Sequence, residues 1–141
     1  MWIYNNKEIT ELPDDVVGFV YLITNLINDK KYIGKKLAKF AKTRYKMHTQ
    51  KNGKRVKKKI RSYVDSDWLT YYGSSDALAK DIELQGKDQF SREIIRLCYS
   101  KAECSYWEAK EQFYNGVLES ADWYNAQISV RCHKNNILGK R

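Results

Sequence analysis

The sequence predicts an α+β fold in which a small, largely antiparallel sheet packs against helices. Two runs rich in β-branched and aromatic residues lie close together near the start of the chain, and a third lies near residue 90. Two segments with apolar residues at helical spacing flank that third run. The chain has 141 residues, enough for one ordinary domain with a core. We therefore expect a single domain over residues 1–141.

The first two runs predict a β-hairpin. Val17–Thr24 (VGFVYLIT) is the first expected strand and Lys31–Gly34 (KYIG) the returning one, with turn-forming Asn28-Asp29 between them. If the connection has an even number of residues, Tyr32 lies opposite an odd-numbered residue of the first strand. It then shares a face of the sheet with Tyr21. A slip of one residue in the register would separate the two tyrosines.

Positive charge is concentrated in one segment. Fifteen Lys and Arg and no Asp or Glu occur from Lys30 to Arg61, while the rest of the chain carries eleven basic and seventeen acidic residues. Asn52-Gly53 predicts a turn between two polar stretches, so we expect residues 35–67 to form a basic insert arm, a projecting ribbon or loop. Such a block beside a mildly acidic body favours a polyanionic partner; the alternative is a solvated surface loop. The expected DNA-binding residues are Lys36, Lys39, Lys42, Lys46, Lys54, Arg55, Lys57, Lys58, Lys59 and Arg61.

A helix and a third strand are expected after the arm. Ser74-Ser75-Asp76 can cap a helix that runs to about Gln85, where Gly86 is a plausible stop. Residues 89–99 contain the string REIIRLCY, which is typical of a strand.

A second helix and a tail complete the chain. Ser100 and Glu103 have the spacing of a capping box and open a helix that we expect to end near Glu119. Residues 126–141 are expected to form a loop-like tail. The positions of the helix expected to face the core are Ala102, Tyr106, Ala109, Phe113 and Val117.

The composition argues against several classes of protein. No apolar run approaches the roughly 18 residues needed to cross a bilayer, and the N-terminal residues lack the pattern of a signal peptide, so we expect an intracellular protein without a membrane partner. Cys98, Cys104 and Cys132 are odd in number, which favours free thiols in a reducing compartment. Their spacing, with His133 added, is not the paired short spacing of zinc motifs.

Several strings resemble the motifs of the GIY-YIG nuclease family. Gly18-Phe19-Val20-Tyr21 and the later Tyr32-Ile33-Gly34 are similar to its two tyrosine motifs, although the first reads Phe-Val-Tyr in place of Gly-Ile-Tyr. Glu111-Gln112-Phe113-Tyr114 resembles the family's glutamate followed by aromatics, and Tyr124-Asn125 resembles its closing pair. The resemblance covers about Val17 to Asn125. It is nearest to small phage-encoded members and to the catalytic domains of intron homing endonucleases.

The basic residues near the second motif extend the resemblance. Lys35 follows the motif, as a lysine does in some members. Arg44 and His48, four residues apart, resemble the family's helical arginine and a nearby histidine. Arg44 lies ten residues after Gly34, farther than the family usually places its arginine, so Arg61 remains a rival.

The resemblance implies a fold, a reaction and a metal site. The implied core is a three-stranded antiparallel sheet flanked by helices, and the implied activity is that of an endonuclease hydrolysing DNA phosphodiesters with one divalent ion, Mg²⁺ or Mn²⁺. One carboxylate can anchor such an ion, which keeps most of its waters. Glu111 is the expected ligand, and Glu108, one turn earlier, is an alternative.

The resemblance also implies roles for the other residues. Tyr21 would be the general base or would orient the attacking water, with the metal or Lys35 lowering the pKa of its phenol. Tyr32 would hold the water or the phosphate through its hydroxyl. The remaining expected site residues are Arg44 as phosphate clamp, His48 as proton shuttle and Asn125 as a hydrogen-bonding group.

A non-catalytic module that grips DNA or RNA through the basic arm is the main alternative function, because interleaved aromatic and basic side chains can stack bases and bind phosphates. A weaker third idea is an inhibitor or structural protein that uses the arm on an acidic protein. For an endonuclease, a two-strand cut requires a homodimer on DNA or two sequential nicks. The family resemblance places the expected activity inside a cell, such as a phage-infected host.

Overall fold

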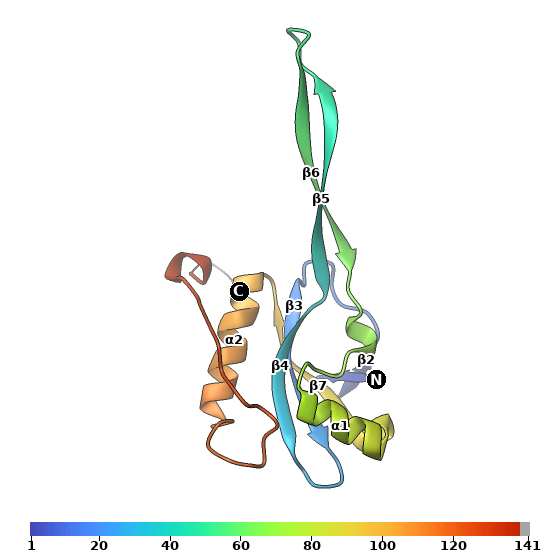
Figure 1. The fold of residues 1–141 in the computed structure, drawn as a ribbon, viewed down its shortest axis with the longest axis vertical. Coiled ribbons are helices and arrows are strands. Elements are labelled where there is room, and N and C mark those ends of the chain that lie inside the picture. Colours follow the sequence, from blue (N-terminus) through green and yellow to red (C-terminus); the bar gives the residue numbers. More distant parts are fainter. Residues whose placement is uncertain (139–141) are drawn as a thin grey trace.

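The computed structural model describes residues 1–138 and, over that part, contains a mixed five-stranded sheet, a separate two-stranded sheet and two α-helices (Figure 1). The strand order of the larger sheet is β2-β1-β7-β3-β4. Its strands are β1 (Trp2–Tyr4), β2 (Lys7–Ile9), β3 (Gly18–Asn25), β4 (Lys31–Leu37) and β7 (Phe90–Cys98). The smaller sheet pairs β5 (Lys39–Thr49) with β6 (Arg55–Asp65), and the helices are α1 (Asp76–Gln85) and α2 (Lys101–Tyr114). Short 3-10 turns occur at Trp68–Thr70, Lys87–Gln89 and Lys134–Asn136.

The larger sheet extends beyond the three antiparallel strands that the resemblance implies. Strands β4, β3 and β7 are antiparallel neighbours, but a hairpin of β1 and β2 joins the edge of β7 through a parallel β1. Asn5 and Asn6 form the turn of this hairpin with φ values of 50° and 64°. Asn tolerates positive φ better than most residues, so this Asn-Asn pair is the sequence signal for the additional hairpin.

The register of the β3–β4 hairpin is the one that the sequence predicts. Tyr21 lies opposite Gly34, and Ile23 lies opposite Tyr32. Because positions two apart along a strand share a face, Tyr21 and Tyr32 lie diagonally on the same face, with ring centroids 6.2 Å apart. The predicted pairing of the two tyrosines is confirmed.

Each face of the sheet has its own core. The face that carries Phe19, Tyr21 and Ile23 packs against the α1 side of the molecule, in a cluster with Trp2, Trp68, Leu78, Phe90, Ile94 and Tyr124. The opposite face carries Val20 and Ile33 and packs under α2, in a cluster with Cys98, Cys104 and Val117. The free thiols of Cys98 and Cys104 are therefore core residues, while Cys132 is exposed. Neither α-helix of the described residues is long and apolar enough to span a membrane.

Strands β5 and β6 form a long hairpin that projects away from the body of the molecule (Figure 1). Each strand has 11 residues, and residues 41–55 are all exposed. The predicted turn at Asn52-Gly53 is confirmed: the Gly53 N–H donates to the carbonyl of Gln50 at 2.9 Å, and Gly53 has φ of 84°. The hairpin spans residues 39–65 and is shorter than the arm expected over residues 35–67, because residues 35–37 belong to β4. We call this hairpin the arm.

Both α-helices begin at the predicted capping residues, and α2 is shorter than predicted. The Ser75 side chain caps α1, and Gly86 follows its last residue with φ of 91°, as predicted. Helix α2 ends at Tyr114, five residues before the expected end, because the Asn115 side chain donates to the Glu111 carbonyl and Gly116 takes φ of 61°.

The face that α2 turns toward the sheet is the predicted one only in part: Ala109 is buried as expected, and so is Val117 beyond the end of the helix. Phe113, expected in the core, is 65% exposed. Cys104 and Gln112 are buried and Glu108 is half-buried, so positions spaced by four residues form the inner stripe of the helix. Compared with the predicted orientation, α2 is rotated about its axis so that Glu108 faces inward. This orientation places Glu108 at the site described next.

Candidate active site

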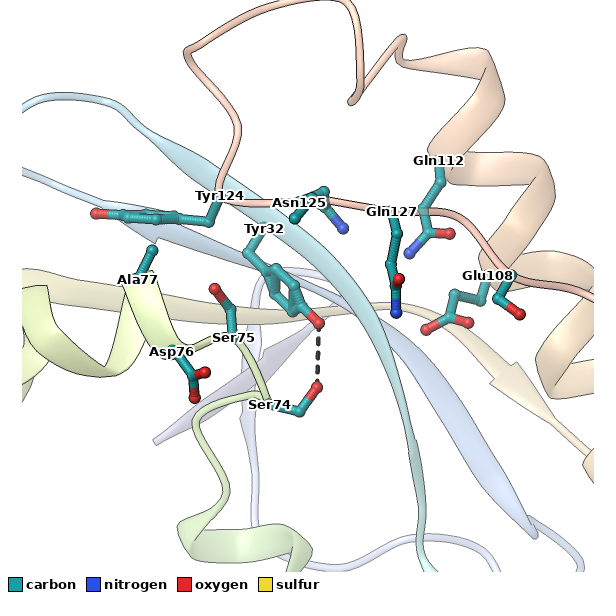
Figure 2. A pocket seen from close by; sticks show the side chains of 12 residues that line it. Tyr32, Ser74, Ser75, Asp76, Ala77, Glu108, Gln112, Tyr124, Asn125 and Gln127 are labelled. Carbon is teal, nitrogen blue, oxygen red and sulfur yellow. Dashed lines mark hydrogen bonds between the residues drawn. The ribbon is translucent and has the colours of Figure 1, made fainter.

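A pocket of about 460 Å³ lies at the β4 edge of the larger sheet. Strand β4 has no further strand beyond it in that sheet, so the start of α1, the side of α2 and the tail converge around its edge (Figures 1 and 2). The pocket is lined by Tyr32, Ser74, Ser75, Asp76, Ala77, Glu108, Gln112, Tyr124, Asn125, Ala126, Gln127 and Ser129.

Tyr124 and Asn125 are counted here as the start of the tail, and they close part of the β4 edge. The Tyr124 N–H donates to the Lys31 carbonyl at 2.7 Å. The Asn125 carboxamide accepts from the Ile33 N–H at 3.1 Å and donates to the Ile33 carbonyl at 2.8 Å. The oxygen of this side chain therefore satisfies the edge N–H of Ile33, and its amide nitrogen shares the Ile33 carbonyl with the side chain of Gln112, which donates to it at 3.0 Å. Asn125 lies at the pocket, as expected, and is held there by the strand that carries Tyr32.

Tyr21 lies beneath the pocket and is 1% exposed. Its ring packs edge-on against Trp2 and Tyr71 and tilts against Tyr32. Burial raises the pKa of its phenol well above the usual value, and Tyr71 and Tyr32 raise it further. This environment favours the protonated hydroxyl, which opposes the general-base role expected for Tyr21 and favours a role as hydrogen-bond donor.

Gly34 and Gly73 let the chain pass close to the two tyrosines. A Cβ on Gly34 would lie 2.6 Å from Cζ of Tyr21, and one on Gly73 would lie 3.4 Å from the Tyr21 hydroxyl and 3.5 Å from the Tyr32 ring. Gly73 also has φ of 90°, a conformation that other residues rarely adopt. The second tyrosine motif therefore needs its glycine because the first tyrosine occupies the space of a side chain there.

Tyr32 and Ser74 join the buried site to solvent. Their hydroxyl oxygens are 3.2 Å apart, and either can be the donor (Figure 2). Tyr32 is half-buried and Ser74 is exposed. Burial raises the pKa of Tyr32, and the bond from Ser74 partly offsets this. The pair forms a short hydroxyl chain from the pocket to water.

Glu108 supplies the carboxylate of the site. Burial raises the pKa of this half-buried side chain, while the ammonium and backbone N–H of Lys35 act against that shift. The charge of Glu108 in turn raises the pKa of both Tyr21 and Tyr32, so the three groups share one electrostatic neighbourhood. In the view of Figure 2 the Gln127 side chain reaches toward the space between Tyr32 and Glu108.

Comparison with known families decides the identity of this arrangement. Residues 2–128 match the family model described as "Putative endonuclease segE, GIY-YIG domain". The chain belongs to the GIY-YIG nuclease family. Membership implies a nuclease-type function on DNA, as the tyrosine motifs suggested. Comparison with curated proteins and with solved structures finds no match.

The GIY-YIG site gathers some of the sequence-predicted residues and leaves others outside. Tyr32 and Asn125 line the pocket, Tyr21 lies beneath it, and Lys35 lies beside Glu108. The Lys35 ammonium donates to the Ser105 hydroxyl at 2.6 Å, which fixes it against α2. Two predicted tyrosines, the lysine and the asparagine are thus brought to one place by β3, β4 and the tail.

Glu111 is one of the predicted residues that the structure does not bring to the pocket. Its carboxylate lies 3.4 Å from Nδ2 of Asn115 at the end of α2. Helical spacing explains the difference, because Glu108 shares the inner stripe with Cys104 and Gln112 and Glu111 does not. The alternative ligand considered from the sequence, Glu108, is therefore the carboxylate that faces the tyrosines.

Arg44, His48 and Arg61 also lie outside the pocket. They belong to the arm, where Arg44 lies opposite Ile60, His48 opposite Val56 and Arg61 opposite Thr43. The expected helical arginine corresponds here to a strand of the arm, because the basic segment pairs with itself as a hairpin. Lys35 is the cation beside Glu108, and Lys36 pairs with Asp67 at 2.7 Å.

Sequence reasoning missed Ser74 as a site residue and Arg92 as a residue that positions the site. Ser74 was expected only as part of a helix cap. Arg92 is 4% exposed, lies over the Tyr72 ring at 4.0 Å and donates to the Tyr71 carbonyl at 2.8 Å. It fastens the segment that carries Tyr71 and Gly73 to the sheet. A charged residue inside an apolar strand run was the signal, since a buried arginine needs partners.

Gly34→Ala is expected to lower the free energy of unfolding by about 1–3 kcal/mol, because the new methyl group overpacks a ring that four other aromatic contacts hold in place. Chemical denaturation measures this. In a Tyr21→Ala background the same change should cost much less. Equal costs in the two backgrounds would show that the ring does not occupy the space above Gly34.

Glu108→Gln is expected to raise the melting temperature at neutral pH. The pKa of Glu108 is raised in the folded protein, so the stability that its protonated form contributes is present below the ordinary glutamate pKa and is lost as pH rises through the raised value. A neutral amide avoids that loss. The difference in melting temperature between variant and parent should shrink toward zero as pH falls below the ordinary pKa, and a difference independent of pH would contradict the assignment.

Proposed function

We propose that this GIY-YIG protein is a DNA endonuclease that hydrolyses phosphodiester bonds at the β4 pocket with one divalent ion, Mg²⁺ or Mn²⁺. The observation that carries the proposal is a half-buried carboxylate, Glu108, in the same electrostatic neighbourhood as Tyr21 and Tyr32. Two protonated phenols on β3 and β4, a lysine on β4 and the carboxylate of α2 suit a reaction that must bind and neutralise a phosphate.

The donor set fits a hard divalent ion that keeps most of its waters. Within residues 1–138 there is no cluster of three or more His, Cys, Asp or Glu side chains. Mg²⁺ is commonly held by one or two carboxylates together with waters and substrate phosphate oxygens, so Glu108 alone can anchor it. When bound there, the ion would offset charge on the phosphate and on the leaving oxygen.

The protein groups would act around the phosphate as follows. Tyr21 and Tyr32, both favoured in the protonated form, would donate hydrogen bonds to the phosphate oxygens or to the attacking water. Lys35 would take the phosphate-clamping role expected of Arg44. The water oxygen would add to phosphorus as the bond to one sugar oxygen breaks. The water proton would leave through the hydroxyls of Tyr32 and Ser74 to solvent, and the released sugar oxygen would take a proton from solvent water.

The arm would hold the DNA outside the pocket. Its Lys and Arg side chains can neutralise backbone phosphates, which makes affinity fall steeply with salt. In this proposal the DNA is cut at the β4 pocket and is bound by the arm. A homodimer on DNA would let two such pockets cut both strands.

Incubation of the purified protein with supercoiled plasmid, in Mg²⁺ and in excess chelator, tests the function. Nicked or linear product in Mg²⁺ alone supports metal-assisted hydrolysis. Plasmid that is retarded on the gel but uncut in both lanes, across several DNA sources and structures, would replace this proposal with the non-catalytic binding module.

A further inference from the structure

The arm carries basic side chains equally on its two faces. Residues that lie opposite each other in an antiparallel pair share a face, so the ladder from Lys42↔Ser62 to Thr49↔Arg55 sorts the side chains of this stretch without ambiguity. The first face carries Lys42, Arg44, Lys46 and Lys58, and the second face carries Arg55, Lys57, Lys59 and Arg61. No acidic residue occurs from residue 40 to residue 64.

Contacts between the arm and the body of the molecule are found at its root, where the Lys39 ammonium donates to the Asp14 carbonyl and the Lys36 ammonium lies over the Phe40 ring. Apart from the half-buried Val56 and Ile60, every residue from 40 to 65 is exposed. Large apolar and aromatic side chains are exposed on both faces: Phe40 and Val64 on the first, Tyr45, Met47 and Tyr63 on the second. Because both faces carry exposed basic and apolar side chains, neither face is the one that packs on the rest of the protein. A partner that explains this pattern must therefore contact both faces.

The length and twist of the arm restrict the shape of that partner. Eleven residues per strand correspond to about 36 Å, which is close to one turn of B-form DNA. Two-stranded ribbons twist strongly, and in Figure 1 the two strands of the arm wind about each other. A flat surface, such as a membrane or a flat acidic protein face, could meet one face over part of this length only.

We infer that the arm enters the major groove of B-form DNA, where its two faces meet the phosphates of the two groove walls. This inference rests on the proposed function and adds the mode of substrate recognition. A ribbon with its side chains is about 10 Å thick, which suits the roughly 12 Å major groove and not the roughly 6 Å minor groove.

The root of the arm ties groove recognition to the position of the cut. Strand β4, which carries Tyr32, Gly34 and Lys35, runs into β5 through the single residue Ala38. The Ser66 hydroxyl donates to the Leu37 carbonyl at 2.6 Å, and the Ser66 N–H donates to the Ala38 carbonyl at 2.9 Å, so both strands of the arm are fastened to the end of β4. The cut should therefore fall at a fixed offset from the groove that the arm occupies.

Two matched triple variants test the inference. Arg44, Lys46 and Lys58 on the first face, or Lys57, Lys59 and Arg61 on the second, are changed to Gln; each set contains one Arg and two Lys from the middle of the arm. Binding to a 30-base-pair DNA duplex is measured without metal over a range of salt. Each variant should lower the slope of log K against log salt by about 2–3, while Lys7, Lys101 and Lys134→Gln, outside the arm, should change it little.

Two further readouts identify the groove. Dimethyl sulfate modifies guanine N7 in the major groove and adenine N3 in the minor groove, and the protein should protect N7 alone in an arm-dependent way. An RNA duplex of the same length, whose A-form major groove is too narrow for a ribbon, should compete poorly. A slope change from one face only, protection at adenine N3, or equal binding of the RNA duplex would overturn the inference.

Cleavage is scored separately so that the two proposals fail independently. Metal-dependent cutting by the parent protein without N7 protection overturns the groove inference and leaves the proposed function. N7 protection that both triple variants lose, in a protein that never cuts DNA, supports the groove inference and overturns the proposed endonuclease activity.

Discussion

Glu108→Gln is expected to lower the rate of DNA cleavage by at least about 10³-fold. Removing a single group that stabilises transition-state charge already costs roughly 10²–10³-fold, and this change also removes the proposed anchor of the metal. The amide has nearly the shape of the carboxylate, so the fold is retained. DNA binding without metal should be close to that of the parent, because the arm is unchanged. Initial rates on a plasmid or a labelled duplex in Mg²⁺ measure the loss.

Glu111→Gln is the matched control for this variant. It makes the same chemical change one turn away on the same helix, at a carboxylate that faces Asn115 and does not line the pocket. We expect its cleavage rate to stay within about threefold of the parent, because Glu111 is half-buried away from the pocket and its change should cost under about 1 kcal/mol. If Glu111→Gln were inactive and Glu108→Gln active, the family's glutamate would be Glu111 and the pocket would be misassigned.

Tyr32→Phe is expected to lower the cleavage rate by about 10²-fold, the lower end of what a positioned proton-transfer group contributes. The variant keeps the ring that packs on Tyr21 and loses only the hydroxyl that bonds to Ser74. Ser74→Ala should cost less, about tenfold, because water can replace an exposed hydroxyl in the chain to solvent. Steady-state rates at saturating DNA separate this loss from an effect on binding.

Tyr114→Phe provides the control for a tyrosine hydroxyl on this protein, since Tyr114 is 85% exposed and lies away from the pocket. Its rate should equal that of the parent. A Tyr32→Phe variant that cleaves at the parental rate would remove the hydroxyl pair from the reaction, and the tyrosines would then serve packing alone.

The central parts of the fold could be predicted from the sequence because local signals there agree with the tertiary structure. Asn28-Asp29 lies in the connection of six residues between the paired Thr24 and Lys31, and this even number sets the register that joins Tyr21 and Tyr32. Ser75 and Gly86 mark the two ends of α1, and Asn52-Gly53 forms the turn of the arm. Each is a local backbone preference that the packed structure retains. The β1–β2 hairpin was missed because its strands have three residues each, too short for a clear alternation.

The candidate site could be predicted only in part, because its residues come from four separate segments. Motif order favoured Glu111, whereas the choice of Glu108 depends on the rotation of α2, and Phe113 at the surface shows that apolar spacing misjudged that rotation. Arg44 was expected at the site because it resembles the family's helical arginine, although the turn at Asn52-Gly53 predicted a ribbon or loop for the same segment. The pairing of β5 with β6 places Arg44 on a strand of the arm and away from the pocket.

The location of a bound metal ion tests the central claim most directly. Crystals of Tyr32→Phe with a DNA duplex and Mn²⁺, measured at the manganese absorption edge, reveal the ion by its anomalous scattering. The account predicts a peak about 2.1 Å from a carboxylate oxygen of Glu108, next to Lys35 and a DNA phosphate. A peak coordinated by Glu111 or Asp76, with Glu108 unliganded, would contradict it.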